Sequence, residues 1–197
     1  ISDITISAGS TTGTVSFTPT DDTTYEGNET AIVAISSVTG LATESGTQTT
    51  TITITDNESA PTVTLASSAS SIAENAGSSL TLTATMSAAT TANVTVSIST
   101  SGTGTEGTDY GTISDITISA GSTTGTASFT PTDDSTYEGD ETAIVAISGV
   151  SGGSASESGT QTVTLTIDEN EDGPTVTLSS SASSIAENAG SSLTLTA

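Results

Sequence analysis

The feature that most constrains this 197-residue chain is an internal repeat of about 113 residues. The segment ISDITISAGSTTGT at 1–14 returns at 113–126, and SIAENAGSSLTLTA at 71–84 returns at 184–197. We therefore divide the chain into the last part of one repeat (1–59, the first unit), a complete repeat (60–172) and the N-terminal strands of the next (173–197, the third unit). A unit of this length is too long for a solenoid motif and fits one β-sandwich domain of about 100 residues.

Apolar and polar residues alternate along the complete repeat, as they do in half-buried strands. Gly- and Ser-rich stretches separate the alternating runs, and no stretch has a helical period. The runs lie at 63–65, 80–84, 94–98, 116–118, 127–129, 144–146 and 163–167. We therefore predict an all-β fold of tandem antiparallel sandwiches with a thin core of Val, Ile, Leu and Ala.

The charge of the chain restricts what it can do. It has 23 Asp and Glu residues and no Lys, Arg, His or Cys. Because no basic side chain is present to neutralise phosphates, nucleic acid is excluded as a partner. No apolar run reaches the roughly 20 residues that span a bilayer, so we expect no membrane insertion in this segment. Ser-His and Cys-His nucleophiles are impossible, and we predict that the protein is not an enzyme.

The acidic residues of the complete repeat are concentrated in two loops, DDSTYEGDE at 133–141 and DENED at 168–172. Crowded carboxylates repel one another unless a cation lies between them. Oxygen ligands from several loops at one end of a sandwich would suit Ca²⁺, which takes six to eight. The alternative is a solvated, self-repelling surface that keeps a β protein soluble. We assign that role to Glu106, Asp115 and Glu157.

Four motifs in order, AENAG, GTDYG, DDSTYEGDE and DENED, resemble those of the Calx-beta domain family. The resemblance covers the whole repeat and implies a seven-strand immunoglobulin-like sandwich with several Ca²⁺ ions at one end. By position, it implies ligands in the complete repeat at Glu74, Asp109, Asp133, Asp134, the Thr136 carbonyl, Glu138, Glu141, Asp168, Glu169 and Asn170.

The same resemblance implies partial ligand sets in the outer units. In the first unit they are Asp21, Asp22, Thr24, Glu26, Glu29, Asp56 and Asn57, and in the third unit only Glu187. The family's terminal run of Asp is altered here to DEN, and in the first unit Thr55 takes its first position. We expect this threonine to weaken one ion site.

These features predict a calcium-binding structural repeat of an extracellular stalk, fibre or surface filament, secreted or attached to a cell. Ca²⁺ would stiffen the domain ends and junctions, and the partners would be neighbouring repeats or like chains in a fibre. One alternative is an adhesin domain that itself binds a surface or carbohydrate ligand. Another is a fibre subunit that polymerises head to tail, with residues 173–197 completing the partial sandwich of the next chain.

Overall fold

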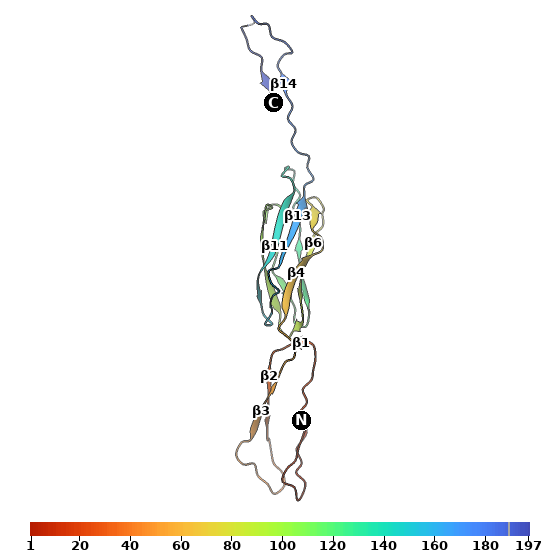
Figure 1. Cartoon of the computed structure of the whole chain (residues 1–197), viewed down its shortest axis with the longest axis vertical. Helices are drawn as coiled ribbons and strands as arrows, with labels where there is room; N and C mark the ends of the chain where they lie inside the picture. The colour runs from red at the N-terminus through yellow and green to blue at the C-terminus, as the bar shows by residue number, and fades with distance from the viewer. Residues whose placement is uncertain (189) are drawn as a thin grey trace.

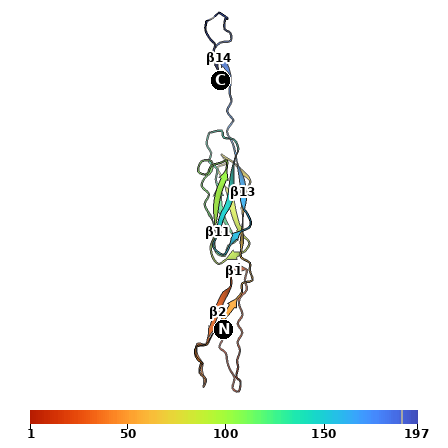
Figure 2. The same cartoon turned by 60° about the vertical axis from the view of Figure 1, so that its left-hand side comes forward.

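The computed structural model describes residues 1–188 and 190–197. The chain is elongated, with one complete sandwich in the middle, the first unit at one end and the third unit at the other (Figures 1 and 2). Strands are the only regular elements among the described residues. In that part of the chain there is no helix long and apolar enough to cross a membrane.

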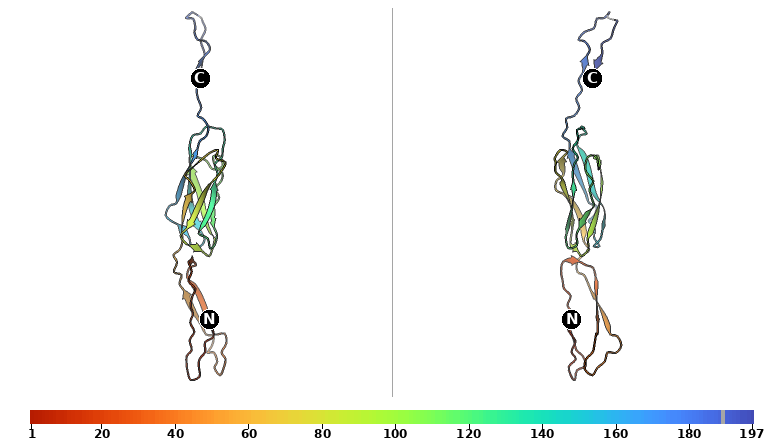
Figure 3. Two further views of the ribbon diagram at one scale, coloured as in Figure 1. Left: turned by 90° about the vertical axis from the view of Figure 1, so that its right-hand side faces the viewer. Right: turned by 180° about the vertical axis from the view of Figure 1, so that it is seen from behind.

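The complete repeat folds into two facing sheets, visible edge-on in Figure 3. The four-stranded sheet has the order β10-β6-β4-β12. Its strands are β4 (Thr62–Ser67), β6 (Leu80–Met86), β10 (Thr124–Phe129) and β12 (Ser156–Glu157). The five-stranded sheet has the order β5-β13-β11-β8-β9. Its strands are β5 (Ser71–Ala73), β8 (Val94–Gly102), β9 (Ile116–Ile118), β11 (Glu141–Ser151) and β13 (Thr162–Asp168).

Most neighbouring strands of the sandwich are antiparallel, but two short edge pairs are parallel. β5 runs parallel to β13, and β12 runs parallel to β4. The chain thus enters through β4 in one sheet and crosses at once to β5 in the other. This places the first and last strands of the five-stranded sheet side by side, which positions the site described below.

The core consists of the inward residues of both sheets, and most of them are Val, Ile and Leu, as predicted. Leu82, Val94 and Leu165 are fully buried. The largest buried side chains are Tyr110 and Phe129, whose ring centroids lie 5.0 Å apart. All seven alternating runs lie within strands, because period-2 alternation turns every second side chain to the same face of a sheet. The fold class predicted from the sequence is therefore confirmed.

The outer units keep the pairing of the complete repeat. In the first unit, β2 (Glu29–Ala34) pairs with β3 (Thr49–Ile54) in the register of β11 with β13. In the third unit, β14 (Ser179–Ser180) pairs with β15 (Leu195–Thr196) in the register of β4 with β6. Their apolar residues are exposed because the facing sheet is missing: Ile4 is 56% exposed, whereas its counterpart Ile116 is fully buried.

Candidate metal centre

Four separate segments bring carboxylates to one end of the sandwich. Glu74 directly follows β5, and Asp109 lies in the loop between β8 and β9. Glu138 precedes β11, and Glu141 opens it. Because β5 is parallel and β11 antiparallel to β13, the end of β13 lies beside the end of β5 and the start of β11, with Ile167 paired to Glu141. Glu169 and Glu171, just past β13, therefore join the same group.

The core holds the loop that carries Asp109. The neighbouring Tyr110 is 1% exposed and packs on Phe129 of β10. The Thr132 N–H donates a 2.9 Å hydrogen bond to the carbonyl of Asp109, which ties this loop to the β10–β11 loop. The loop between β8 and β9 is thereby fixed to the core, and Asp109 has a set position opposite Glu138 and Glu141.

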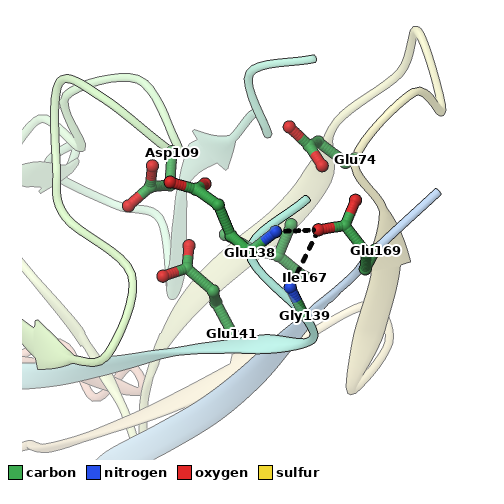
Figure 4. Close-up of a pocket in the computed structure, with 7 residues that line it drawn as sticks. All are labelled: Glu74, Asp109, Glu138, Gly139, Glu141, Ile167 and Glu169. Carbon is green, nitrogen blue, oxygen red and sulfur yellow. Dashed lines mark hydrogen bonds between the residues drawn. The ribbon is translucent and has the colours of Figure 1, made fainter. Parts of the chain in front are cut away.

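The carboxylates form two groups of three. One consists of Asp109, Glu138 and Glu141, and the other of Glu74, Glu169 and Glu171. Within each group, one carboxylate oxygen of each residue lies within 4.8 Å of one carboxylate oxygen of each of the other two residues. Figure 4 shows Glu138 directed toward Asp109 above Glu141, with Glu74 and Glu169 on the other side of the same pocket. No Lys, Arg or His exists anywhere in the chain to balance this charge.

Glu169 connects the two acidic loops through backbone amides. Its Oε2 accepts hydrogen bonds from the N–H groups of Glu138 (2.6 Å) and Gly139 (2.9 Å), drawn as dashed lines in Figure 4. Its Oε1 accepts from the N–H groups of Asn170 (2.9 Å) and Glu171 (3.0 Å). These bonds, first among them the one from the Glu171 amide, lower the pKa of Glu169 to about 2. Glu169 is therefore ionised, and its hydrogen bonds connect the β10–β11 loop to the segment after β13.

Crowding and burial raise the pKa values of the other acidic residues in the cluster. Burial, together with repulsion from Asp109, raises the pKa of Glu141 to about 6. A carboxyl–carboxylate hydrogen bond with Glu169, together with burial, raises the pKa of Glu171 to about 7. Burial also raises the pKa values of Glu74 and Glu138, and neighbouring carboxylates add to both shifts. The raised pKa values mean that these carboxylates bind protons readily, and a bound cation could take the place of those protons.

The donor set fits a hard cation. All candidate ligands are oxygen atoms, which Ca²⁺ prefers. When Glu171 is ionised, its Oε2 is buried and accepts no hydrogen bond from any N–H or O–H group among the described residues. A buried carboxylate oxygen in the ionised state is costly unless a proton or cation satisfies it. This oxygen, with those of Glu74 and Glu169, points to a cation of the calcium type.

The remaining expected ligands of the complete repeat lie in the same loops but outside the two groups. Asp134 accepts a 2.6 Å hydrogen bond from the Thr136 N–H, and its own N–H donates to Glu74 Oε1 at 3.1 Å. The Asp168 carbonyl accepts from the Glu74 N–H at 3.0 Å, and the Asn170 side-chain amide donates to Glu171 at 2.8 Å. Asp133 is exposed, and its charge helps to raise the pKa of Glu74.

The first unit carries part of this arrangement, without counterparts of Glu74 and Asp109. One pocket brings together all seven of its expected ligands, from Asp21, Asp22, Thr24, Glu26 and Glu29 to Asp56 and Asn57. Asp56 takes the place of Glu169: its Oδ2 accepts from the N–H groups of Glu26 (2.8 Å) and Gly27. Thr55 also lines this pocket, where the complete repeat has Asp168. Glu187 of the third unit is exposed, and no group of three acids includes it among the described residues.

Glu171 and its counterpart Glu58 lie outside the ligand set that we expected. Glu58 lines the pocket of the first unit, and its N–H donates to Asp56 Oδ1 as the N–H of Glu171 donates to Glu169. A signal was present in the sequence, because the two glutamates stand 113 residues apart in equivalent acidic runs. The first and fifth positions of those runs differ in their chemistry, with Asp168 against Thr55 and Asp172 against Ser59, whereas the fourth is glutamate in both.

An immunoglobulin-like sandwich with an oxygen-only acidic cluster at one end defines the class of this domain. Residues 2–58 and residues 56–171 each match the Calx-beta domain family, and the chain belongs to that family. Calx-beta domains are non-catalytic, calcium-binding β-sandwich domains. The resemblance in the four motifs is thus confirmed.

One solved structure is similar over 98% of its own length and 55% of this chain, with 18% identity and a TM-score of 0.46. It is described as the crystal structure of the apo form of the Calx CBD1 domain. No curated protein matches the chain.

Proposed function

We propose that each complete repeat binds several Ca²⁺ ions at its acidic end and that the array serves as a calcium-stiffened extracellular stalk or filament. One observation carries the proposal. Two groups of three carboxylates meet at the end of the sandwich from which the chain continues into the next unit, and no cationic side chain accompanies them.

The ligands divide between the two groups. Asp109, Glu138 and Glu141 would hold one ion, and Glu74, Glu169 and Glu171 a second. Asp133, Asp134 and Asp168 stand in the adjoining loops and supply oxygens for further coordination. Bound Ca²⁺ supplies the positive charge that the chain lacks, and its attraction to the carboxylates offsets their mutual repulsion, so all of them can ionise.

The position of the cluster supports a role in stiffening. Glu169 and Glu171 begin the linker to the third unit. Gly173 in that linker lies against the ring of Tyr137, so close that a Cβ added to the glycine would meet the ring at 3.5 Å. Holding the two glutamates to Glu74 and Asp109 would fix the first residues of the linker to the body of the sandwich. A fixed linker turns flexibly joined domains into a rod.

Calorimetric titration and thermal unfolding test the proposal. Calcium added to the stripped protein should bind with a measurable heat and raise the melting temperature. An ion present at 100 times its dissociation constant stabilises the folded form by about 2.7 kcal/mol. Mg²⁺ at the same concentration should do less, because it demands a small octahedral site. Absence of heat, with an unchanged melting temperature, would rule the proposal out.

A further inference from the structure

The first unit touches the complete repeat through a pair of strands as well as through the linker. β1 (Thr24–Tyr25) pairs in parallel with β7 (Ala89–Thr90), Thr24 opposite Ala89 and Tyr25 opposite Thr90. β1 belongs to the acidic loop of the first unit, and β7 belongs to the turn between β6 and β8 at the far end of the sandwich from the acidic cluster. Figure 1 shows β1 at this boundary.

The turn that receives β1 is held firmly. Thr90 is 1% exposed, and its hydroxyl donates a 2.7 Å hydrogen bond to the carbonyl of Ala92. Its own carbonyl accepts from the Gly121 N–H at 2.8 Å. Gly153 lies so close that a Cβ there would come within 2.6 Å of the Thr90 hydroxyl oxygen. We call Ala89–Asn93, Gly121 and Gly152–Gly153 the receiving corner.

The linker adds a second fixed point at the same junction. Pro61 is fully buried, and its carbonyl accepts a 3.1 Å hydrogen bond from the Ser156 N–H. A linker fixed at one point still allows the units to swivel about it. A second contact through β1 and β7 removes that freedom, because the backbone pairing has a register and a direction.

The complete repeat carries the counterpart of β1 at its own acidic end, where the segment is not paired as a strand. Thr136–Tyr137 is the counterpart of Thr24–Tyr25, and the Thr136 N–H is bonded to Asp134 as the Thr24 N–H is bonded to Asp22. Tyr137 is 49% exposed, whereas Tyr25, which pairs with the receiving corner, is less exposed. The counterparts of Ala89 and Thr90 for the following unit would lie about 113 residues further on, beyond Ala197.

We propose that Thr136–Tyr137 is a docking strand for the receiving corner of a following repeat of the same kind, as Thr24–Tyr25 is for the corner at Ala89–Thr90. Each junction is then a two-point joint, with a covalent linker and a two-residue parallel strand pair. The corner of this chain is already taken by its own first unit, so the partner is the next repeat along the array. The geometry of this joint is taken from the β1–β7 pairing. Its biological use, holding successive repeats in line, rests on the proposed stalk function.

The first junction contains both halves of the proposed joint, so disulfide trapping there tests whether β1 and β7 form it; the protein contains no cysteine of its own. Thr24→Cys with Ala89→Cys places two thiols on facing residues of neighbouring strands. Thr24→Cys with Thr90→Cys moves one thiol to the opposite face, since successive side chains alternate. We expect the first pair to form an intramolecular disulfide at least about tenfold faster than the second.

The trapping is run both in calcium and in a chelator, with peptide mapping to identify the bond. Preferred formation of the 24–89 disulfide in both conditions, or in calcium alone, supports the joint. Equal rates for the two pairs in both conditions would overturn it. Calcium binding by the same proteins is measured separately, so failure of the joint and failure of the proposed function give different results.

Discussion

At the scale of single residues, the charge on Glu141 should act in opposite directions with and without calcium. Glu141→Gln removes a ligand, and we expect calcium affinity to fall at least about tenfold. Without calcium, the same change removes repulsion with Asp109 and Glu138 and should slightly raise the melting temperature. Thermal unfolding in calcium and in chelator measures both effects.

Asp3→Asn is the matched control for this substitution. Asp3 is exposed, carries the same charge, and accepts no hydrogen bond from the described residues. We expect it to change neither the affinity nor the sign of the calcium effect. If both variants behaved alike, a general effect of net charge would replace the site as the explanation.

A second residue-scale prediction concerns pH. The pKa values of Glu141 and Glu171 are raised from 4.5 to about 6 and about 7. The folded state therefore binds more protons than the unfolded state in this window, so these groups stabilise most below pH 4.5, and that contribution is lost as pH rises through 6 to 7. Urea midpoints of calcium-stripped protein should fall from pH 5 to 7.5, and less so in Glu171→Gln.

The pH effect on calcium binding has the opposite sign, because binding must displace the same protons. Calcium affinity should rise between pH 5 and 7.5. Glu169, whose pKa is lowered to about 2, contributes throughout this window and loses its effect only as pH falls toward 2. An affinity that did not vary with pH would contradict the assignment of Glu141 and Glu171 to the cation site.

The concentration of carboxylates in two loops, in a chain without any balancing cationic side chain, predicted the acidic end. It could not predict the separate roles within it. Glu169 is occupied by four backbone amides, whereas Glu171 has an oxygen with no partner among the described residues. The difference depends on where the two loops meet in space.

At the scale of elements, Glu169 should hold the β10–β11 loop even when no calcium is bound. Glu169→Ala frees the amides of Glu138 and Gly139. We expect faster hydrogen exchange at these two amides in chelator as well as in calcium. A residue that served only as an ion ligand would alter their exchange in calcium alone, so the measurement in chelator decides between the roles.

Gly153 tests the receiving corner without touching any acidic residue. Both Gly153 and Gly159 have positive φ, so alanine at either should cost about 1 kcal/mol. Only at Gly153 would the added Cβ meet Thr90; at Gly159 it meets open space. Gly153→Ala should therefore slow the 24–89 disulfide several-fold, and Gly159→Ala should leave its rate unchanged.

The long strands could be read from the sequence because their alternation is sustained, but several of the shortest ones could not. β7 and β12 have two residues each, and the three residues of β5 include one buried side chain, Ile72, so no period shows; β9 is as short as β5 but alternates through Ile116 and Ile118. β5, β7 and β12 depend on neighbouring strand edges that tertiary folding brings near. Since β5 and β7 hold the site and the joint, the functional elements were the least predictable ones.

At the scale of the whole molecule, calcium should change the shape of the chain as well as its stability. We expect small-angle X-ray scattering to give a longer maximum dimension in calcium than in chelator, because the acidic linker after β13 stiffens. Asp109→Asn combined with Glu141→Gln should resemble chelation in its effect. An identical scattering profile in both conditions would contradict the stiffening role while leaving calcium binding itself intact.

The repeat could be measured from the sequence because near-identical segments recur in register. The contact between repeats could not, because Thr24–Tyr25 and Ala89–Thr90 have no pattern that marks them as partners. The pairing exists only because the linker places one repeat's acidic loop on the next repeat's corner. The positions of the domain junctions can thus be predicted from the sequence, whereas the contacts at each junction can be known only from the folded structure.

The parallel pairing of β5 with β13 has a mechanical consequence. β5 follows the entering strand β4, and β13 is the last strand of the complete repeat, so tension transmitted through β4 pulls β5 and β13 past each other in opposite directions. The load falls across the whole ladder from Ser71–Thr166 to Ala73–Asp168 in shear, and no single hydrogen bond can be peeled away first. The Glu74 N–H bond to Asp168 extends this ladder into the acidic cluster. A cation bound by Glu74 and Glu169 would link the ends of β5 and β13, the two strands that this shear force would separate.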